Sequence, residues 1–193
     1  MLYNNQLGLL RITCYFIKDS KQRCIMYTSI VRSLFEHCCQ IWAPQDAMQR
    51  RAVKWILKES FESYSEQVFL KKQRDLDLLP MKFKFIYSDL ILFYKIVYNK
   101  VEIMLPPHYV TLIEQHNVLR VTRNNEAISK GNDKLKFKSN ILPKINSFKN
   151  SFFVRTLTKW NELPLNIREI ESLDKFTIAL KDHLWLILGF EPD

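Results

Sequence analysis

The sequence predicts a mainly α-helical protein, an irregular bundle of about six helices with a basic loop or small β-hairpin between residues 117 and 147. Apolar residues recur at helical spacing along most of the chain. Only 3 glycines and 7 prolines occur among 193 residues, so few positions interrupt a helix. Hydrophobic residues make up 47% and charged residues 25%, which is close to the usual composition of a globular protein with a buried core.

The first predicted helix covers residues 21–42. Its apolar residues lie near helical spacing and are Ile25, Met26, Ile30, Leu34 and Ile41. Pro44 ends this segment, because proline cannot continue a helix and restricts the residue before it.

A second helix is predicted at residues 46–59, with Asp46 as its N-cap. One side of this helix is apolar and carries Met48, Ala52, Trp55 and Ile56. By the 3.6-residue period, the opposite side collects four basic residues within a sector of about 100°, namely Arg50, Arg51, Lys54 and Lys58. Farther along the chain, Ser63 and Glu66 have the spacing of a capping box for a third helix.

A long helix is predicted at residues 81–99, after Pro80. It is apolar nearly all round, which requires burial on several sides, either in the core or against a wall that this chain lacks. Helical periodicity returns at residues 148–161 and 173–188. Ser172 is the expected N-cap of the last helix, and Gly189 is expected to end it in a left-handed turn.

We expect three regions: a helical region at residues 1–116, a basic segment at 117–147, and a C-terminal helical region at 148–193. Short alternating pieces at residues 118–122 and 135–138 allow a small hairpin in the basic segment.

The positive charge is concentrated in the middle of the chain, which has a net charge of +9. Residues 117–160 carry 10 Lys and Arg against 2 Asp and Glu, a local net charge of +8. Such a block either attracts polyanions or is a solvated loop.

The four cysteines are Cys14, Cys24, Cys38 and Cys39. Their spacing fits neither a disulfide between distant segments nor a zinc knuckle, and we expect reduced thiols in a helical core. This predicts a cytoplasmic or nuclear protein without a metal or cofactor. No uncharged apolar stretch approaches the roughly 18 to 20 residues of a membrane span, so no membrane partner is expected.

The sequence predicts no catalytic site. A polymerase or nuclease needs clustered carboxylates to hold two divalent cations, and no two acidic residues are adjacent here. In Tyr87-Ser88-Asp89-Leu90 a leucine stands where a polymerase motif has its second aspartate, and the segment lies in a predicted helix. The three glycines are too dispersed for a phosphate loop, and His183 is expected to be a partly buried core residue.

Several short motifs follow one another in a characteristic order. They are Leu7-Gly8 with Arg11, Val31-Arg32-Ser33-Leu34-Phe35-Glu36-His37-Cys38 leading to Trp42-Ala43-Pro44, Gln49-Arg50-Arg51-Ala52-Val53-Lys54, Leu78-Leu79-Pro80-Met81, Asp89-Leu90 with Tyr94-Lys95-Ile96, and a tail with Phe148, Ser151-Phe152-Phe153, Arg155, Trp160-Asn161-x-Leu163-Pro164, Phe176 and Leu180. The set covers nearly the whole chain. It resembles the region that follows the reverse transcriptase catalytic core in non-LTR (LINE-type, jockey-like) retrotransposon polyproteins.

The resemblance implies a noncatalytic, thumb-proximal and C-terminal part of an RNA-directed DNA polymerase that binds RNA or DNA without sequence specificity. The palm aspartates and the endonuclease of that family have no counterpart in this sequence. Two departures fit a decaying or repurposed copy. Only four residues separate Pro44 from Gln49, where the family has a longer stretch, and Lys84-Phe85 stands where the family has paired arginines.

Basic residues near these motifs are the candidate phosphate contacts. They are Arg50, Arg51, Lys54, Lys58, Arg120, Arg123, Lys134, Lys136, Lys138, Lys149 and Arg155. Phe137 has two interpretations, stacking on an unpaired base or packing in the core. Trp160 is expected to pack against the last helix, and Asn161 to cap or satisfy the turn into Pro164.

Two other functions are compatible with the sequence. The chain is a helical protein-interaction module if residues 81–99 dock on a polymerase palm domain or cause self-association. Alternatively, it is a non-functional relic of a retroelement.

Overall fold

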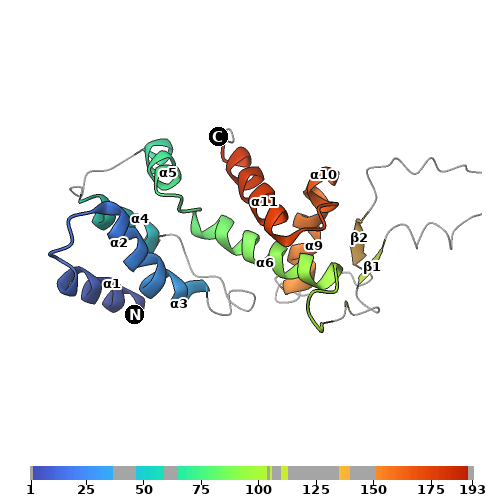
Figure 1. Cartoon of the computed structure of the whole chain (residues 1–193), viewed down its shortest axis with the longest axis horizontal. Coiled ribbons are helices and arrows are strands. Elements are labelled where there is room, and N and C mark those ends of the chain that lie inside the picture. Colours follow the sequence, from blue (N-terminus) through green and yellow to red (C-terminus); the bar gives the residue numbers. More distant parts are fainter. Residues whose placement is uncertain are drawn as a thin grey trace, which may run out of the picture. The chain divides into compact units, whose positions relative to one another are not determined.

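The computed structural model describes residues 2–36, 47–58, 65–103, 105, 110–112, 135–139 and 151–190 (Figure 1). The protein is mainly α-helical, as predicted. When residues 20–36 are counted as one continuous helix, the described residues form eight helices and one two-stranded sheet. Two of these helices, α1 (Leu2–Thr13) and the short α10 (Leu165–Arg168), were not among the six predicted from the sequence.

The chain divides into two compact units, Met1–Phe85 and Ile86–Asp193. The first unit contains α1, α2 (Ser20–Met26), η1 (Tyr27–Arg32), α3 (Ser33–Glu36), α4 (Ala47–Leu57), α5 (Glu66–Asp75) and the start of α6 (Met81–Val97). The second contains the rest of α6, β1 (Val110–Leu112), β2 (Phe137–Ser139), α9 (Phe152–Glu162), α10 and α11 (Leu173–Ile187). Residues 86–103, which the sequence assigned to the N-terminal region, therefore group with the C-terminal helices.

The core of the first unit is apolar and comes from α1, the helix at 20–36, α4, α5 and the start of α6. Its buried members are Leu7, Leu10, Cys14, Tyr27, Val31, Ala52, Val53, Ile56, Phe69, Leu78, Met81 and Phe85.

The helix at residues 20–36 buries a different face from the one that the sequence predicted. Ile25, Ile30 and Leu34 are exposed, whereas Tyr27 and Val31 are buried. The middle of this helix, η1, is a π-helix, in which residues five apart rather than four apart lie one above the other. The wider turn brings the Arg32 side chain to the buried side, so a 3.6-residue period could not identify that face.

Helix α5 begins two residues later than the capping-box pattern predicted. Its N-cap is Ser65, whose hydroxyl accepts a hydrogen bond from the Val68 N–H at 3.4 Å. The prediction of Ser63 as N-cap was therefore wrong. Ser63 itself lies outside the described residues, as do Pro44 and Asp46.

The core of the second unit is built from aromatic rings. Tyr94 of α6 stacks on Phe176 of α11 with ring centroids 4.2 Å apart. Phe93 lies 5.1 Å from Trp160 of α9. The Tyr94 hydroxyl donates a hydrogen bond to the carbonyl of Glu171, which ties α6 to the residues before α11. Offset and tilted ring contacts of this kind add to the burial of the apolar surface.

The strand pair differs in part from the predicted hairpin. Residues 137–139 form β2, close to the predicted second piece at 135–138. Its antiparallel partner is β1, with Leu112 opposite Phe137, so the pair starts before residue 117. The predicted first piece, residues 118–122, lies outside the described residues.

Gly189 ends α11 in the left-handed conformation predicted for it, with a φ of 87°. Its N–H donates to the Leu186 carbonyl at 2.9 Å, and the Phe190 N–H donates to Trp185 at 3.0 Å, which is a Schellman motif. A Cβ atom added at Gly189 would meet no atom within 4 Å, and the same holds for Gly8 inside α1. At either position the effect of an added methyl group on the free energy of unfolding therefore depends on the backbone conformation and not on a steric clash.

We expect Gly189→Ala to lower the free energy of unfolding by about 1 kcal/mol, because an L-residue is strained in the left-handed region. Gly8→Ala should raise it by roughly 0.5 to 1 kcal/mol, because alanine loses less entropy in a helix. Urea denaturation of both variants measures the two changes. Effects of the same sign would contradict the backbone conformation of one of the two glycines.

Candidate nucleic-acid interface

Helix α4 carries the predicted basic residues on the side opposite the core. Ala52, Val53 and Ile56 are buried, whereas Arg50 and Arg51 are exposed and Lys54 is half-buried. We call Arg50, Arg51 and Lys54 the α4 basic face. The helix contains no acidic residue, so this face has a formal charge that no carboxylate of its own helix offsets.

Lys58 directly follows α4 and is exposed. Its φ of 56° places it in the left-handed region, and its N–H donates to the Trp55 carbonyl at 3.3 Å. Lys58 thus ends the helix, and its side chain lies one residue beyond α4 rather than on it.

A buried arginine binds the C-terminal end of α4. The Arg23 guanidinium donates to the carbonyls of Trp55 at 2.8 Å and Ile56 at 3.4 Å. Its other nitrogens donate to the Ile17 carbonyl at 2.8 and 2.7 Å. The Trp55 carbonyl thus accepts from Arg23 in addition to the Lys58 N–H, and the guanidinium places a cation at the end of α4 where the helix dipole favours it.

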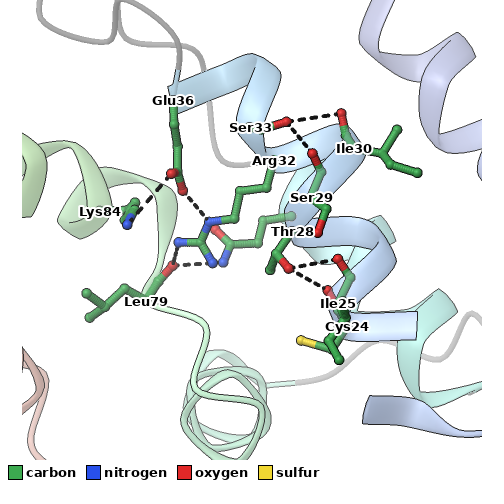
Figure 2. A network of polar contacts seen from close by, with 11 residues as sticks. Cys24, Ile25, Thr28, Ser29, Ile30, Arg32, Ser33, Glu36, Leu79 and Lys84 are labelled. Carbon is green, nitrogen blue, oxygen red and sulfur yellow. Dashed lines mark hydrogen bonds and ion pairs between the residues drawn. The ribbon is translucent and has the colours of Figure 1, made fainter. Parts of the chain in front are cut away.

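The start of α4 is held through the Leu79 carbonyl. The buried Gln49 amide donates to this oxygen at 2.9 Å, and Arg32 of η1 donates to it at 2.8 Å. Arg32 also bonds Glu36 at 2.9 Å, and Glu36 lies 3.7 Å from Lys84 (Figure 2). Because both ends of α4 are fixed by buried hydrogen bonds, the direction of its basic face is fixed as well.

Phe69 of α5 and Arg11 of α1 contact residues of the α4 basic face. The Arg50 guanidinium lies over the Phe69 ring of α5, 5.0 Å from the ring centroid, in a cation–π contact. Arg11 of α1 donates to the Arg51 carbonyl at 3.1 Å. Sequence reasoning did not identify Arg11 as a member of this face, because no local pattern indicates which helix packs beside α4.

Apart from Lys58, the other predicted phosphate contacts belong to the second unit or lie outside the described residues. Lys136 precedes β2 of the second unit and is half-buried, and Lys138 lies on β2 and is exposed. The remaining ones, apart from Arg155, lie outside the described residues and are Arg120, Arg123, Lys134 and Lys149.

Arg155 of α9 forms a bidentate ion pair with Asp89 of α6. Its Nε donates at 2.8 Å and its Nη2 at 3.2 Å to the two carboxylate oxygens. Burial raises the pKa of Asp89, and the Arg155 guanidinium offsets only part of this effect. Any phosphate bound by Arg155 has to compete with Asp89 for the guanidinium.

Asn161 has a different role from the predicted one in the turn into Pro164. Its side-chain oxygen accepts a hydrogen bond from the Phe137 N–H at 3.0 Å, and its side-chain nitrogen donates to the Phe137 carbonyl at 2.7 Å. The neighbouring Trp160 is fully buried, and its Nε1 donates to Leu135 at 2.8 Å. Phe137 is buried too, so of its two interpretations the structure favours core packing.

The described residues contain no group of three or more His, Cys, Asp and Glu side chains that is able to hold a metal ion. Cys14 is buried and Cys24 half-buried, both with free thiols, while Cys38 and Cys39 lie outside the described part. His183 is half-buried, as predicted, and burial lowers its pKa. Among the described helices, none is long and apolar enough to cross a membrane.

Helix α6 carries the apolar side chains on which docking to a partner would depend. These side chains are buried or half-buried, and none of them belongs to the exposed large hydrophobic residues of the described chain.

Comparisons with protein-family models, curated proteins and solved structures found no match for this chain.

Replacing Arg155 with methionine tests whether it serves the fold or a phosphate. The variant leaves the Asp89 carboxylate buried without its cation, and we expect a loss of about 1 to 3 kcal/mol in the free energy of unfolding at pH 7. The pKa of Asp89 should rise further, so the loss should shrink as the pH falls and the carboxyl group protonates. Urea denaturation between pH 4 and pH 7 measures this dependence, and a loss independent of pH would contradict the role of the ion pair.

Replacing Asn161 with aspartate keeps an acceptor for the Phe137 N–H but removes the donor to its carbonyl. We expect a loss of about 1 to 3 kcal/mol in the free energy of unfolding, because a half-buried carbonyl then faces a carboxylate. Hydrogen exchange at the Phe137 amide, together with urea denaturation, measures the change. Unchanged stability would show that this side-chain amide does not hold the strand.

Proposed function

We propose that this chain binds RNA or DNA through its phosphates, without sequence specificity and without catalysis, through the α4 basic face. The observation that carries the proposal is the division of α4 into two sides. Residues at three core positions are buried, and the three basic residues point the other way on a helix without acidic residues. Arginine and lysine side chains on one helical face neutralise phosphates and give affinity that does not depend on base identity.

The contacts of the motif residues support the same proposal. In Gln49-Arg50-Arg51-Ala52-Val53-Lys54, the glutamine, alanine and valine are buried, and the basic residues are exposed or half-buried. A phosphate-binding helix needs such a pattern, in which some residues of the motif attach the helix to the core and the basic residues stay accessible to phosphates. On this proposal the chain corresponds to the post-catalytic region of a non-LTR retrotransposon reverse transcriptase.

The test is fluorescence anisotropy with a labelled DNA duplex of mixed sequence, titrated with salt. For the triple variant R50Q/R51Q/K54Q, we expect the slope of log K against log salt to become less steep by about 2 to 3, since each lost phosphate contact removes about 0.9. The matched control is K82Q/K100Q/K175Q, which removes the same charge from three exposed lysines elsewhere in the chain. Thermal melts monitored by circular dichroism verify that both variants are folded.

Two outcomes contradict the proposal. Absence of binding to the duplex and to either of its single strands at low salt, by the folded wild-type chain, would exclude a nucleic-acid surface. An equal loss in the two triple variants would mean that net charge, and not the α4 basic face, determines the affinity.

A further inference from the structure

Two aromatic side chains stand out at the C-terminal end of α1 because they are exposed. Tyr15 is 78% exposed and Phe16 is 66% exposed. Their rings meet edge to face, with centroids 6.0 Å apart. Among the aromatic residues whose exposure the structure describes, no other is as exposed, and most described rings of the second unit are packed against one another, so the exposure of this pair calls for a reason.

Hydrogen bonds on both sides of the aromatic pair tie it to α4. Arg11, four residues before Tyr15, donates to the Arg51 carbonyl. Ile17, directly after Phe16, accepts from Arg23, which also donates to the Trp55 carbonyl at the end of α4. The segment that carries the pair is therefore tied to α4 on both sides, directly through Arg11 and through Arg23 at Ile17.

The charged residues near the pair in sequence are mostly basic. Helix α1 contains no acidic residue, and Arg11 has no ion pair among the described residues. Lys18 and Lys21 are exposed after the pair. The one carboxylate nearby in sequence, Asp19, accepts hydrogen bonds from the Lys21 and Gln22 amides as the N-cap of α2.

We propose that Tyr15 and Phe16 form a stacking platform for unpaired bases, so that the nucleic acid bound by the α4 basic face is single-stranded. This inference rests on the proposed function and names its ligand class. A single strand offers a polyanionic backbone and free base faces at once, and bases stack on aromatic rings whatever their identity. In a duplex the base faces are already stacked and out of reach of the two rings.

Charge complementarity favours this ligand over a protein partner. A protein that covered two aromatic rings would also have to bring acidic groups to Arg11, Lys18 and Lys21, whereas a nucleic acid supplies a phosphate with every base. Two leucine substitutions, Y15L/F16L, separate the possibilities, because leucine retains apolar surface but has no π-face.

The experiment measures anisotropy of the full chain with three labelled probes: a 12-nucleotide RNA, the DNA strand of the same sequence, and the corresponding DNA duplex. We expect Y15L/F16L to lose about tenfold or more in affinity for both single strands, as removal of base stacks does, and to retain duplex affinity. Tyr15→Phe, which keeps the ring, should bind as the wild type does. The matched control is L9A/I12A, which removes two aliphatic side chains of α1 that are 56% and 74% exposed and should change neither affinity.

The outcomes distinguish this inference from the proposed function. Unchanged single-strand affinity in Y15L/F16L, with salt-dependent binding that R50Q/R51Q/K54Q still weakens, would overturn the stacking platform and leave the proposed function intact. Equal losses in Y15L/F16L and L9A/I12A would replace base stacking by a general apolar contact. A wild-type dimer in sedimentation velocity that Y15L/F16L dissociates would assign the rings to an interface between copies. No binding to any probe would remove both proposals.

Discussion

The orientation of the candidate interface depends on one acceptor, the carbonyl oxygen of Leu79. Arg32 and Gln49 both donate to it, at 2.8 and 2.9 Å, and all three residues are buried. A carbonyl oxygen has two lone pairs, so this group is saturated and its two donors are satisfied together. Loss of either donor would remove one of the two hydrogen bonds to this buried oxygen and leave the other in place. This oxygen links three segments, namely the helix at residues 20–36, α4 and the residues before α6. The links hold the Gln49 side of α4 toward the core, so Arg50 and Arg51 lie on the exposed side.

Of the two helices that donate to the Leu79 carbonyl, the sequence predicted the buried side of one and not of the other. The 3.6-residue period predicted the two sides of α4, because its apolar and its basic residues each recur at helical spacing. The buried side of residues 20–36 did not follow, since it contains Arg23 and Arg32 and includes a π-helical turn. A periodicity argument assigns arginine to solvent. The acceptors that bury the two arginines are the carbonyl of Ile17, six residues from Arg23, and those of Trp55 and Leu79, which are distant in sequence.

The second unit shows a similar limit on a smaller scale. Its longer helices α6, α9 and α11 were predictable from apolar spacing, and the burial of Trp160 from the size of the indole ring, whereas the short α10 was not. The role of Asn161 was not, because a side-chain amide beside a proline-containing turn has an obvious local partner. In the structure the amide instead pairs both backbone groups of Phe137, as a neighbouring strand would. A strand of three residues has few bonds of its own, so a side chain from α9 completes its pairing.

The arginines that the structure describes fall into two groups: some are buried or paired within the fold, and others lie on the exposed side of α4. The second group contributes positive charge that a polyanion can reach, whereas the buried arginines do not. Arg23, Arg32 and Arg168 are buried and donate to backbone carbonyls, and Arg155 is bound by a carboxylate. A guanidinium suits this work because it presents five donors in a fixed plane and is weakly hydrated compared with an ammonium group. The net charge of +9 therefore overstates the surface on which a polyanion can settle. What singles out α4 among the described helices is its side chains: three basic groups lie on the side away from the core, and no acidic residue lies among them. The exposed pair Tyr15 and Phe16 follows α1, whose Arg11 donates to the Arg51 carbonyl of α4.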